Sequence, residues 1–179
     1  MTADTRTICA VRRARPVVHL LAGLPGSGKT TYARELEASG VARVSVDEQM
    51  LARYGQIGID YRVEDHGDLL APVVTWARER VVGTVSTGAS VVLDHGLGTC
   101  KDRDAFKLLA LRNGADWELA HFRVAISVLL DRLDERARHA PSASMHITPE
   151  MLRYLASVYE EPNGEGERLI DTEATGLER

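Results

Sequence analysis

Short apolar runs alternate with amphipathic segments along most of this chain. The runs occupy residues 17–22, 41–46, 90–93, 117–124 and 168–171, and such runs are typical of strands buried on both faces of a parallel sheet. The helices predicted by apolar residues at helical spacing are 29–38, 51–54, 68–87, 101–112, 126–138 and 149–159. Because each parallel crossover needs a helix to return the chain, the pattern predicts a three-layer α/β fold. We expect a parallel sheet of about five strands with helices on both faces.

Several features interrupt this periodicity. Residues 1–15 form a basic lead-in that we expect to be a flexible, solvated tail, so the predicted domain spans residues 16–179. Residues 55–67 are predicted as a surface excursion, and residues 141–146 as a mobile loop beside a small lid. Pro72 is expected in the first turn of the long helix that follows the excursion, the position where a helix tolerates proline.

Composition narrows the class of protein. The chain has 179 residues, 44% of them hydrophobic, which suits one domain with an apolar core. Its formal net charge of −4 argues against a protein that grips a long nucleic acid. Cys9 and Cys100 stand far apart without a CxxC motif, so neither a disulfide framework nor a zinc site is expected. No apolar run approaches the roughly 20 residues of a membrane span, and we expect a cytoplasmic protein without a membrane partner.

The strongest chemical signal is the segment from Gly23 to Thr30, GLPGSGKT, which matches the pattern GxxxxGK[ST]. It lies between a predicted buried strand and a predicted helix. Glycines let the backbone wrap closely around a phosphate, and the positive end of the helix dipole then points at the same place. Lys29 can reach the β- and γ-phosphates, and the Thr30 hydroxyl can bind Mg²⁺. The residues of this segment predicted to bind a nucleotide are Gly23, Pro25, Gly26, Ser27, Gly28, Lys29, Thr30 and Thr31.

The motif defines a P-loop NTPase fold but not its reaction. A GTPase switch would carry an Asn-Lys-x-Asp sequence, which this chain lacks, and residues 94–98 do not match DxxG. A transport-type ATPase would carry a long signature segment, and a ring-forming ATPase would need a longer chain than this. A small P-loop kinase remains, with the choice between ATP and GTP still open.

Two acids stand at the ends of predicted strands. Asp47 follows the second strand, at the sheet edge where open α/β folds bind ligands, and it could accept the proton of an attacking hydroxyl. It could instead cap the next helix. Asp94 ends an apolar strand, which is the Walker B arrangement for holding Mg²⁺, with a turn-forming residue as the alternative. Which acid is the general base stays open, and His95 is either a substrate contact or a turn residue.

Arg132 and Arg136 lie four residues apart on one face of a predicted helix, beside the predicted mobile loop. Arginines in this position can fold over a triphosphate and offset the charge that builds up during transfer. Acidic neighbours on the same helix offer the alternative of surface ion pairs. For Arg103, a substrate contact and a solvated helix start are both open.

Together these segments resemble the P-loop kinases grouped with polynucleotide kinase, chloramphenicol phosphotransferase and zeta toxins. The likeness covers about residues 16–171 and rests on the segments 23–31, 45–48, 91–94 with Arg103, 129–136 and 159–162. The resemblance implies ATP-dependent phosphorylation of a hydroxyl, with ATP and Mg²⁺ as cofactors. It further implies that Asp47 is the base, that Arg132 or Arg136 is the lid arginine, and that adenine lies near Pro162.

One position departs from the pattern of polynucleotide kinase. That enzyme has an arginine three residues after its base, where this chain has Met50. With the acidic net charge, this favours a small-molecule acceptor, such as a nucleoside or an antibiotic hydroxyl. The alternatives are a polynucleotide 5′ end, a sugar-nucleotide, or a regulatory ATPase module that docks a partner through residues 1–15 and 55–67. The oligomeric state is open.

Overall fold

The computed structural model describes residues 14–139 and 147–171 of the chain. At its centre is a five-stranded sheet with the order β2-β3-β1-β4-β5, and each neighbouring pair is parallel. The strands are β1 (Val17–Ala22), β2 (Ala42–Ser45), β3 (Val91–Asp94), β4 (Asp116–Phe122) and β5 (Glu167–Ile170). The predicted fold class is confirmed.

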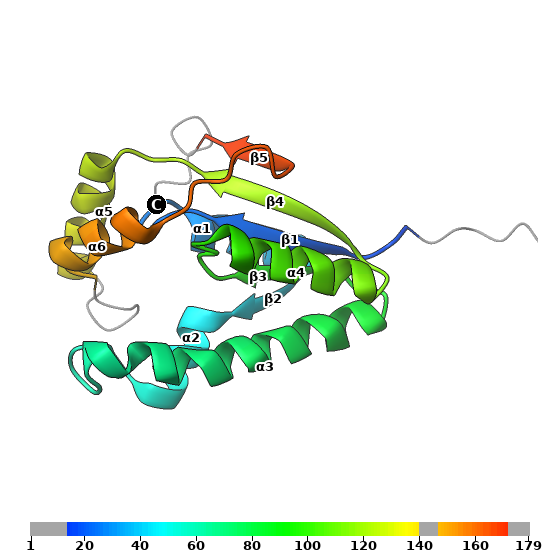
Figure 1. Cartoon of the computed structure of the whole chain (residues 1–179), viewed down its shortest axis with the longest axis horizontal. Coiled ribbons are helices and arrows are strands. Elements are labelled where there is room, and N and C mark those ends of the chain that lie inside the picture. Colours follow the sequence, from blue (N-terminus) through cyan, green and yellow to red (C-terminus); the bar gives the residue numbers. More distant parts are fainter. Residues whose placement is uncertain (1–13, 140–146, 172–179) are drawn as a thin grey trace, which may run out of the picture.

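Helices cover both faces of this sheet. They are α1 (Lys29–Ala38), α2 (Val46–Tyr54), α3 (His66–Ser86), α4 (Cys100–Arg112), α5 (Ile126–His139) and α6 (Pro149–Val158), with a 3₁₀ turn η1 (Val63–Asp65) before α3. Figure 1 shows α3 and α4 running alongside the sheet, while α5 and α6 stand together at the end where β1 and β4 finish. Among the described residues, no helix combines the length and apolar character that crossing a membrane requires.

Alternate residues of the strands enter two separate cores. Leu21 of β1 packs with Ala33 of α1 on one face, whereas Leu20 packs with Val81 of α3 and Phe106 of α4 on the other. All five of these side chains are at most 2% exposed. Because apolar helices cover both faces, the strands read as continuous apolar runs, which is the pattern from which the parallel sheet was predicted.

The structure corrects the expected course of the chain between α2 and α3. Helix α3 begins at His66, so the excursion predicted at residues 55–67 ends earlier, with η1 leading into the helix. Pro72 therefore lies in the second turn of α3 and not in the first. Its missing N–H leaves the carbonyl of Asp68 without its usual helical bond.

The predicted mobile loop at 141–146 and most of the predicted tail at 1–15 lie outside the described residues, although Arg15 donates to Asp116 at 2.9 Å.

The segment between α6 and β5, residues 159–166, is called the strap here, and it is fastened to α4. Glu165 accepts hydrogen bonds from Arg103 Nε at 2.9 Å and Nη2 at 2.6 Å, and Lys107 Nζ lies 3.0 Å from the same carboxylate. Arg103 is fully buried and also donates to the carbonyl of Leu97. Sequence analysis left a solvated position and a substrate contact open for Arg103. The structure excludes the solvated position, because Arg103 is fully buried and its donors are engaged by the strap and by Leu97. The substrate contact stays a prediction.

The charge of Glu165 gives this fastening a pH dependence. Hydrogen bonding from Arg103, aided by Lys107, lowers the pKa of Glu165 to about 2. A carboxyl whose pKa is depressed in the folded state stabilises above its unfolded pKa of about 4.3, and this stabilisation is lost as the pH falls toward the folded value. Glu165→Gln is therefore expected to lower the free energy of unfolding by about 3 kcal/mol at pH 7.

Urea denaturation of the wild type and Glu165→Gln checks this prediction. The difference between them should be constant above about pH 5 and lose about half its size by pH 3. Glu79→Gln, at an exposed position on α3, is the control and should match the wild type at both pH values. A difference that stays constant down to pH 3 would contradict the ion-pair explanation.

Candidate functional site

The predicted site residues meet where the strands end. Because the strands are parallel, their carboxyl ends share one edge of the sheet, beside α5 and α6 in Figure 1. Ser45 at the end of β2 pairs with Asp94 at the end of β3, and Asp47 lies two residues further along the chain. The turn between β1 and α1, residues 23–28, opens at the same edge. This turn is called the cradle here.

The backbone of the cradle has a shape that side chains would prevent. Gly26 and Gly28 have φ angles of 83° and 96°, in the left-handed region that favours glycine. A Cβ atom on Gly23 would lie 2.8 Å from the carbonyl oxygen of Phe122, so the cradle packs directly on the end of β4. Gly28 is the N-cap of α1 and supplies no side-chain hydrogen bond to it. The first amides of α1 are therefore available to an anion, as phosphate binding requires.

Lys29 folds back over the cradle. Its Nζ donates to the carbonyl of Leu24 at 2.8 Å and lies 3.4 Å from Ser27 Oγ. Burial lowers the pKa of Lys29 to about 8, although the carboxylates of Asp47 and Asp94 oppose that shift. The Lys29 ammonium therefore lies beside the cradle, where it can pair with a bound anion. Thr30 and Thr31 follow it in the first turn of α1.

Asp94 is the buried charge of the site, with only 4% of the residue exposed. Its Oδ1 accepts from the Thr30 hydroxyl at 3.1 Å, so the two predicted metal ligands meet. Its Oδ2 accepts from Arg43 Nε at 3.0 Å and Nη2 at 2.6 Å. A hydroxyl and a carboxylate at this spacing are the hard oxygen donors that suit Mg²⁺. Arg43 was not among the residues predicted for the site, although an arginine inside an otherwise apolar strand end was a usable signal.

Asp47 lies in the first turn of α2, and its side chain is exposed. The cap of α2 is Ser45, whose Oγ accepts from the amide of Glu48 at 3.3 Å, so the alternative that Asp47 caps this helix is wrong. The Asp47 carboxylate acts electrostatically on Lys29 and on Arg136, which places it among the groups around the cradle.

The loop after β3 closes one side of the site. A Cβ atom on Gly96 would lie 3.3 Å from the carbonyl oxygen of Gly23 and 3.4 Å from Lys29 Cε. His95, next to it, has a buried Nδ1 with no hydrogen-bond partner among the described residues. Burial lowers the pKa of His95 below its usual value, so this imidazole is neutral near pH 7. The predicted substrate contact of His95 stays a prediction.

Helix α5 lies against the cradle on the other side. A Cβ atom on Gly26 would approach Leu133 Cγ to 3.3 Å, and Leu133 packs with Leu152 of α6. Partial desolvation lowers the pKa of Arg136, and Asp47 opposes this shift, so Arg136 stands within electrostatic range of the predicted base. Arg132 lies one turn earlier on α5 and is half-buried. The roles predicted for the two arginines stay predictions.

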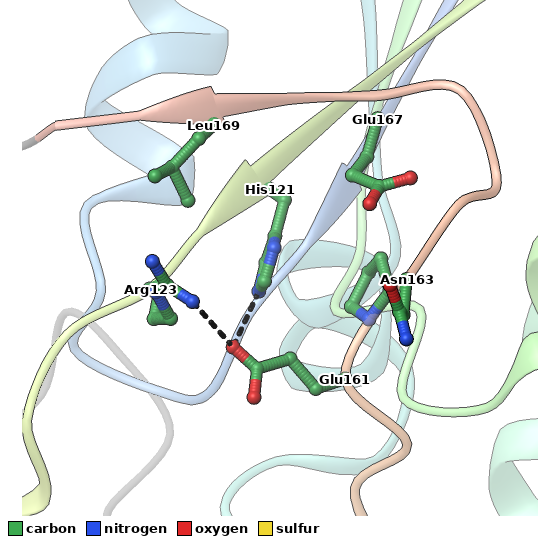
Figure 2. Close-up of a pocket in the computed structure, with 7 residues that line it drawn as sticks. His121, Arg123, Glu161, Asn163, Glu167 and Leu169 are labelled. Carbon is green, nitrogen blue, oxygen red and sulfur yellow. Dashed lines mark ion pairs between the residues drawn. The ribbon is translucent and has the colours of Figure 1, made fainter.

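A pocket of about 450 Å³ lies beside the strap, over β4 and β5. Pro162, the residue predicted near adenine, lines it, together with His121, Arg123, Glu161, Asn163, Glu167 and Leu169. Figure 2 shows Glu161 reaching toward His121 and Arg123, with Oε1 3.7 Å from His121 Nε2 and from Arg123 Nη1. These two residues precede and follow Phe122, on whose carbonyl oxygen and Cβ the cradle packs at the end of β4.

Comparison with known proteins agrees with this architecture. A model of a family described as an AAA domain matches residues 18–162, and the chain belongs to this family. No curated protein shows significant similarity to the sequence. Among solved structures, a presumed kinase from Chloroflexus aurantiacus J-10-fl is 18% identical, with 89% of each chain covered and a TM-score of 0.67.

Two further structures carry more specific names. A gluconokinase from Sinorhizobium meliloti 1021 is 20% identical, covers 89% of this chain and 83% of its own, and has a TM-score of 0.59. A chain of the Pnkp1/Rnl/Hen1 RNA repair complex is 18% identical with a TM-score of 0.67, covering 83% of this chain but only 45% of its own. The predicted relation to the P-loop kinase group is confirmed by the family and by the shared fold. These comparisons support a phosphotransferase in general.

The pKa of Lys29 predicts how nucleotide binding depends on pH. Only the protonated ammonium attracts phosphate, so affinity for a triphosphate should be level below about pH 8 and fall by up to about tenfold per pH unit above it. Lys29→Met should bind at least about tenfold more weakly at pH 7 and lose this dependence. Titration with a fluorescent ATP analogue from pH 7 to about pH 9 measures both effects. An identical pH dependence in the wild type and the variant would show that Lys29 does not bind the phosphates.

Proposed function

We propose that this protein is a kinase that transfers the γ-phosphoryl group of Mg·ATP to a hydroxyl group of a small molecule. The observation that carries the proposal is the arrangement at the sheet edge. The cradle and Lys29 stand beside the Thr30–Asp94 pair, which is bonded at 3.1 Å, and the exposed Asp47 lies within electrostatic range of Lys29. Phosphoryl transfer needs these parts together: an anion cradle, a cation, a place for the metal ion and a base.

Each group has a distinct role in the proposed reaction. The cradle amides and Lys29 neutralise the phosphates, and Arg136 offsets the charge that develops during transfer. Mg²⁺, held through Thr30 and Asp94, would polarise the phosphate oxygens. Asp47 accepts the proton of the acceptor hydroxyl while the oxygen of that hydroxyl bonds to the γ-phosphorus. The bond from that phosphorus to the bridging oxygen breaks, and ADP leaves.

The environments of the two acids favour Asp47 as the base. Asp94 is buried, and its oxygens already accept hydrogen bonds from Thr30 and Arg43. Both carboxylate oxygens of Asp94 are therefore occupied by donors of the protein before an acceptor hydroxyl arrives. Asp47 is exposed at the site edge and can reach an incoming hydroxyl.

The surroundings of Asp47 also favour a small acceptor. Met50, at the position where polynucleotide kinase has an arginine, is fully buried in the core beneath α2. No cation is therefore presented from that position toward the phosphates of a polynucleotide, and the chain has a net charge of −4. The names of two structural neighbours, a gluconokinase and a sugar kinase from Janibacter, add weight to a polyhydroxyl acceptor.

Asp47→Asn tests the proposed base. Transfer to the acceptor should fall by about 10²- to 10⁴-fold, while affinity for Mg·ATP stays within about threefold of the wild type. The acceptor is found by incubating the protein with ATP and a panel of sugars, nucleosides, aminoglycosides, sugar-nucleotides and 5′-hydroxyl oligonucleotides. Products are detected by phosphorus NMR and mass spectrometry. Asp68→Asn, in the first turn of α3, is the matched control.

The same panel separates the proposal from its rivals. A phosphorylated oligonucleotide or sugar-nucleotide would replace the small-molecule acceptor, whereas inorganic phosphate as the sole product would favour a regulatory ATPase module. Full transfer activity in Asp47→Asn would remove Asp47 from the mechanism.

The pocket beside the strap is proposed to hold the adenine base. Leu169 is 52% exposed and lines the pocket, so a planar base can cover its apolar surface. Leu169→Ser should weaken ATP binding by about tenfold through lost apolar burial, without changing affinity for inorganic tripolyphosphate, which has no base. Lys29→Met should weaken both ligands. Competition binding with ATP and tripolyphosphate provides the measurement, and equal ATP affinities for Leu169→Ser and the wild type would place the base elsewhere.

A further inference from the structure

Arg43 is a cation placed where the fold would otherwise have an apolar residue. It belongs to β2, pairs in register with Val92 of β3, and its side chain is only 7% exposed. Burying a guanidinium is unfavourable unless hydrogen bonds and opposite charge compensate it. The carboxylates that surround it are those of Asp94, Glu48 and, more distantly, Glu37 at 3.9 Å.

The two ends of the guanidinium join different parts of the site. On one side, Nε and Nη2 both donate to Oδ2 of Asp94, at 3.0 and 2.6 Å. This leaves Oδ1 of Asp94 turned to the Thr30 hydroxyl. On the other side, Nη1 and Nη2 donate to Glu48, at 3.2 and 2.7 Å.

Glu48 belongs to the first turn of α2, immediately after Asp47. A single planar group therefore connects the strand-end acid beside the cradle to the helix turn that carries the proposed base. The paired donors of an arginine fix both the distance and the angle of a carboxylate, which a lysine ammonium cannot do.

We propose that Arg43 is a positioning residue for phosphoryl transfer: it orients the Asp94 carboxylate toward Thr30 and fixes the first turn of α2 relative to the cradle. This inference rests on the proposed function. It assigns to Arg43 no contact with ATP or the acceptor, and its effect passes through Asp94 and Glu48. The interactions that orient a metal-binding carboxylate typically change metal affinity or activity by 10- to 100-fold when removed.

The decisive measurement is the factor by which Mg²⁺ tightens binding of a non-hydrolysable ATP analogue, obtained by calorimetry with Mg²⁺ and with EDTA. Arg43→Lys and Arg43→Gln should lower this factor by about tenfold, while affinity in EDTA stays within about threefold of the wild type. The turnover rate of phosphoryl transfer from Mg·ATP to the acceptor should fall by about 10- to 100-fold. A purely structural role would instead weaken binding equally in both buffers.

Two other variants complete the experiment. Arg34→Gln removes an exposed contact to the same Glu48, at 3.3 Å, without touching Asp94, and should match the wild type. Glu48→Gln leaves the Asp94 contacts in place and should lower turnover without changing the Mg²⁺ factor. It also provides a readout if Arg43→Gln does not fold.

The outcomes separate this inference from the proposed function. If Mg²⁺ does not tighten binding to the wild type, the proposed function fails, and this inference fails with it. If the wild type responds and both Arg43 variants keep its Mg²⁺ factor and turnover, the inference alone is overturned.

Discussion

The carboxylate of Asp94 is a buried charge, and the rest of the site is arranged to keep it paired. Thr30 from the cradle helix and Arg43 from the neighbouring strand satisfy its two oxygens. A charge buried without such partners would be strongly destabilising, so α1, β2 and β3 must meet at this point. The same contacts hold one oxygen beside the phosphate cradle, where a metal ion can use it. Stability and the proposed catalysis therefore depend on the same pairing.

The parallel sheet explains why the functional groups converge at all. Each strand of such a sheet ends at the same edge, so residues distant in sequence become neighbours there. The cradle is fixed on this edge because Gly23 allows it to pack on β4, and α5 closes over it through Leu133. On the far side of β4, the strap residues Glu161, Pro162 and Asn163 line the pocket, and the Arg103–Glu165 ion pair fastens the strap to α4. The nucleotide site is thus proposed to extend from a rigid phosphate end to a pocket for the base.

Elements whose signal is local could be located from the sequence. The cradle is one contiguous motif with the expected flanking strand and helix, and Asp94 directly ends an apolar run. A role that depends on a distant partner could not be located in this way: Arg43 bonds to an acid 51 residues away, and Arg103 to one 62 residues away. Acidic residues are too common in this sequence for the distant partner of an arginine to be identified from its position along the chain. Asp47 was ambiguous for a related reason, since a neighbouring serine could also cap the helix.

The claim on which this account depends is that the amides from Gly23 to Thr30 enclose a triphosphate. Hydrogen–deuterium exchange, compared with and without Mg·ATP, measures those amides directly. The account predicts that exchange slows across residues 23–30 and the loop after β3 when the nucleotide is added, because bound phosphate engages the amides and restrains the turn. Unchanged exchange in the cradle at saturating nucleotide would contradict it.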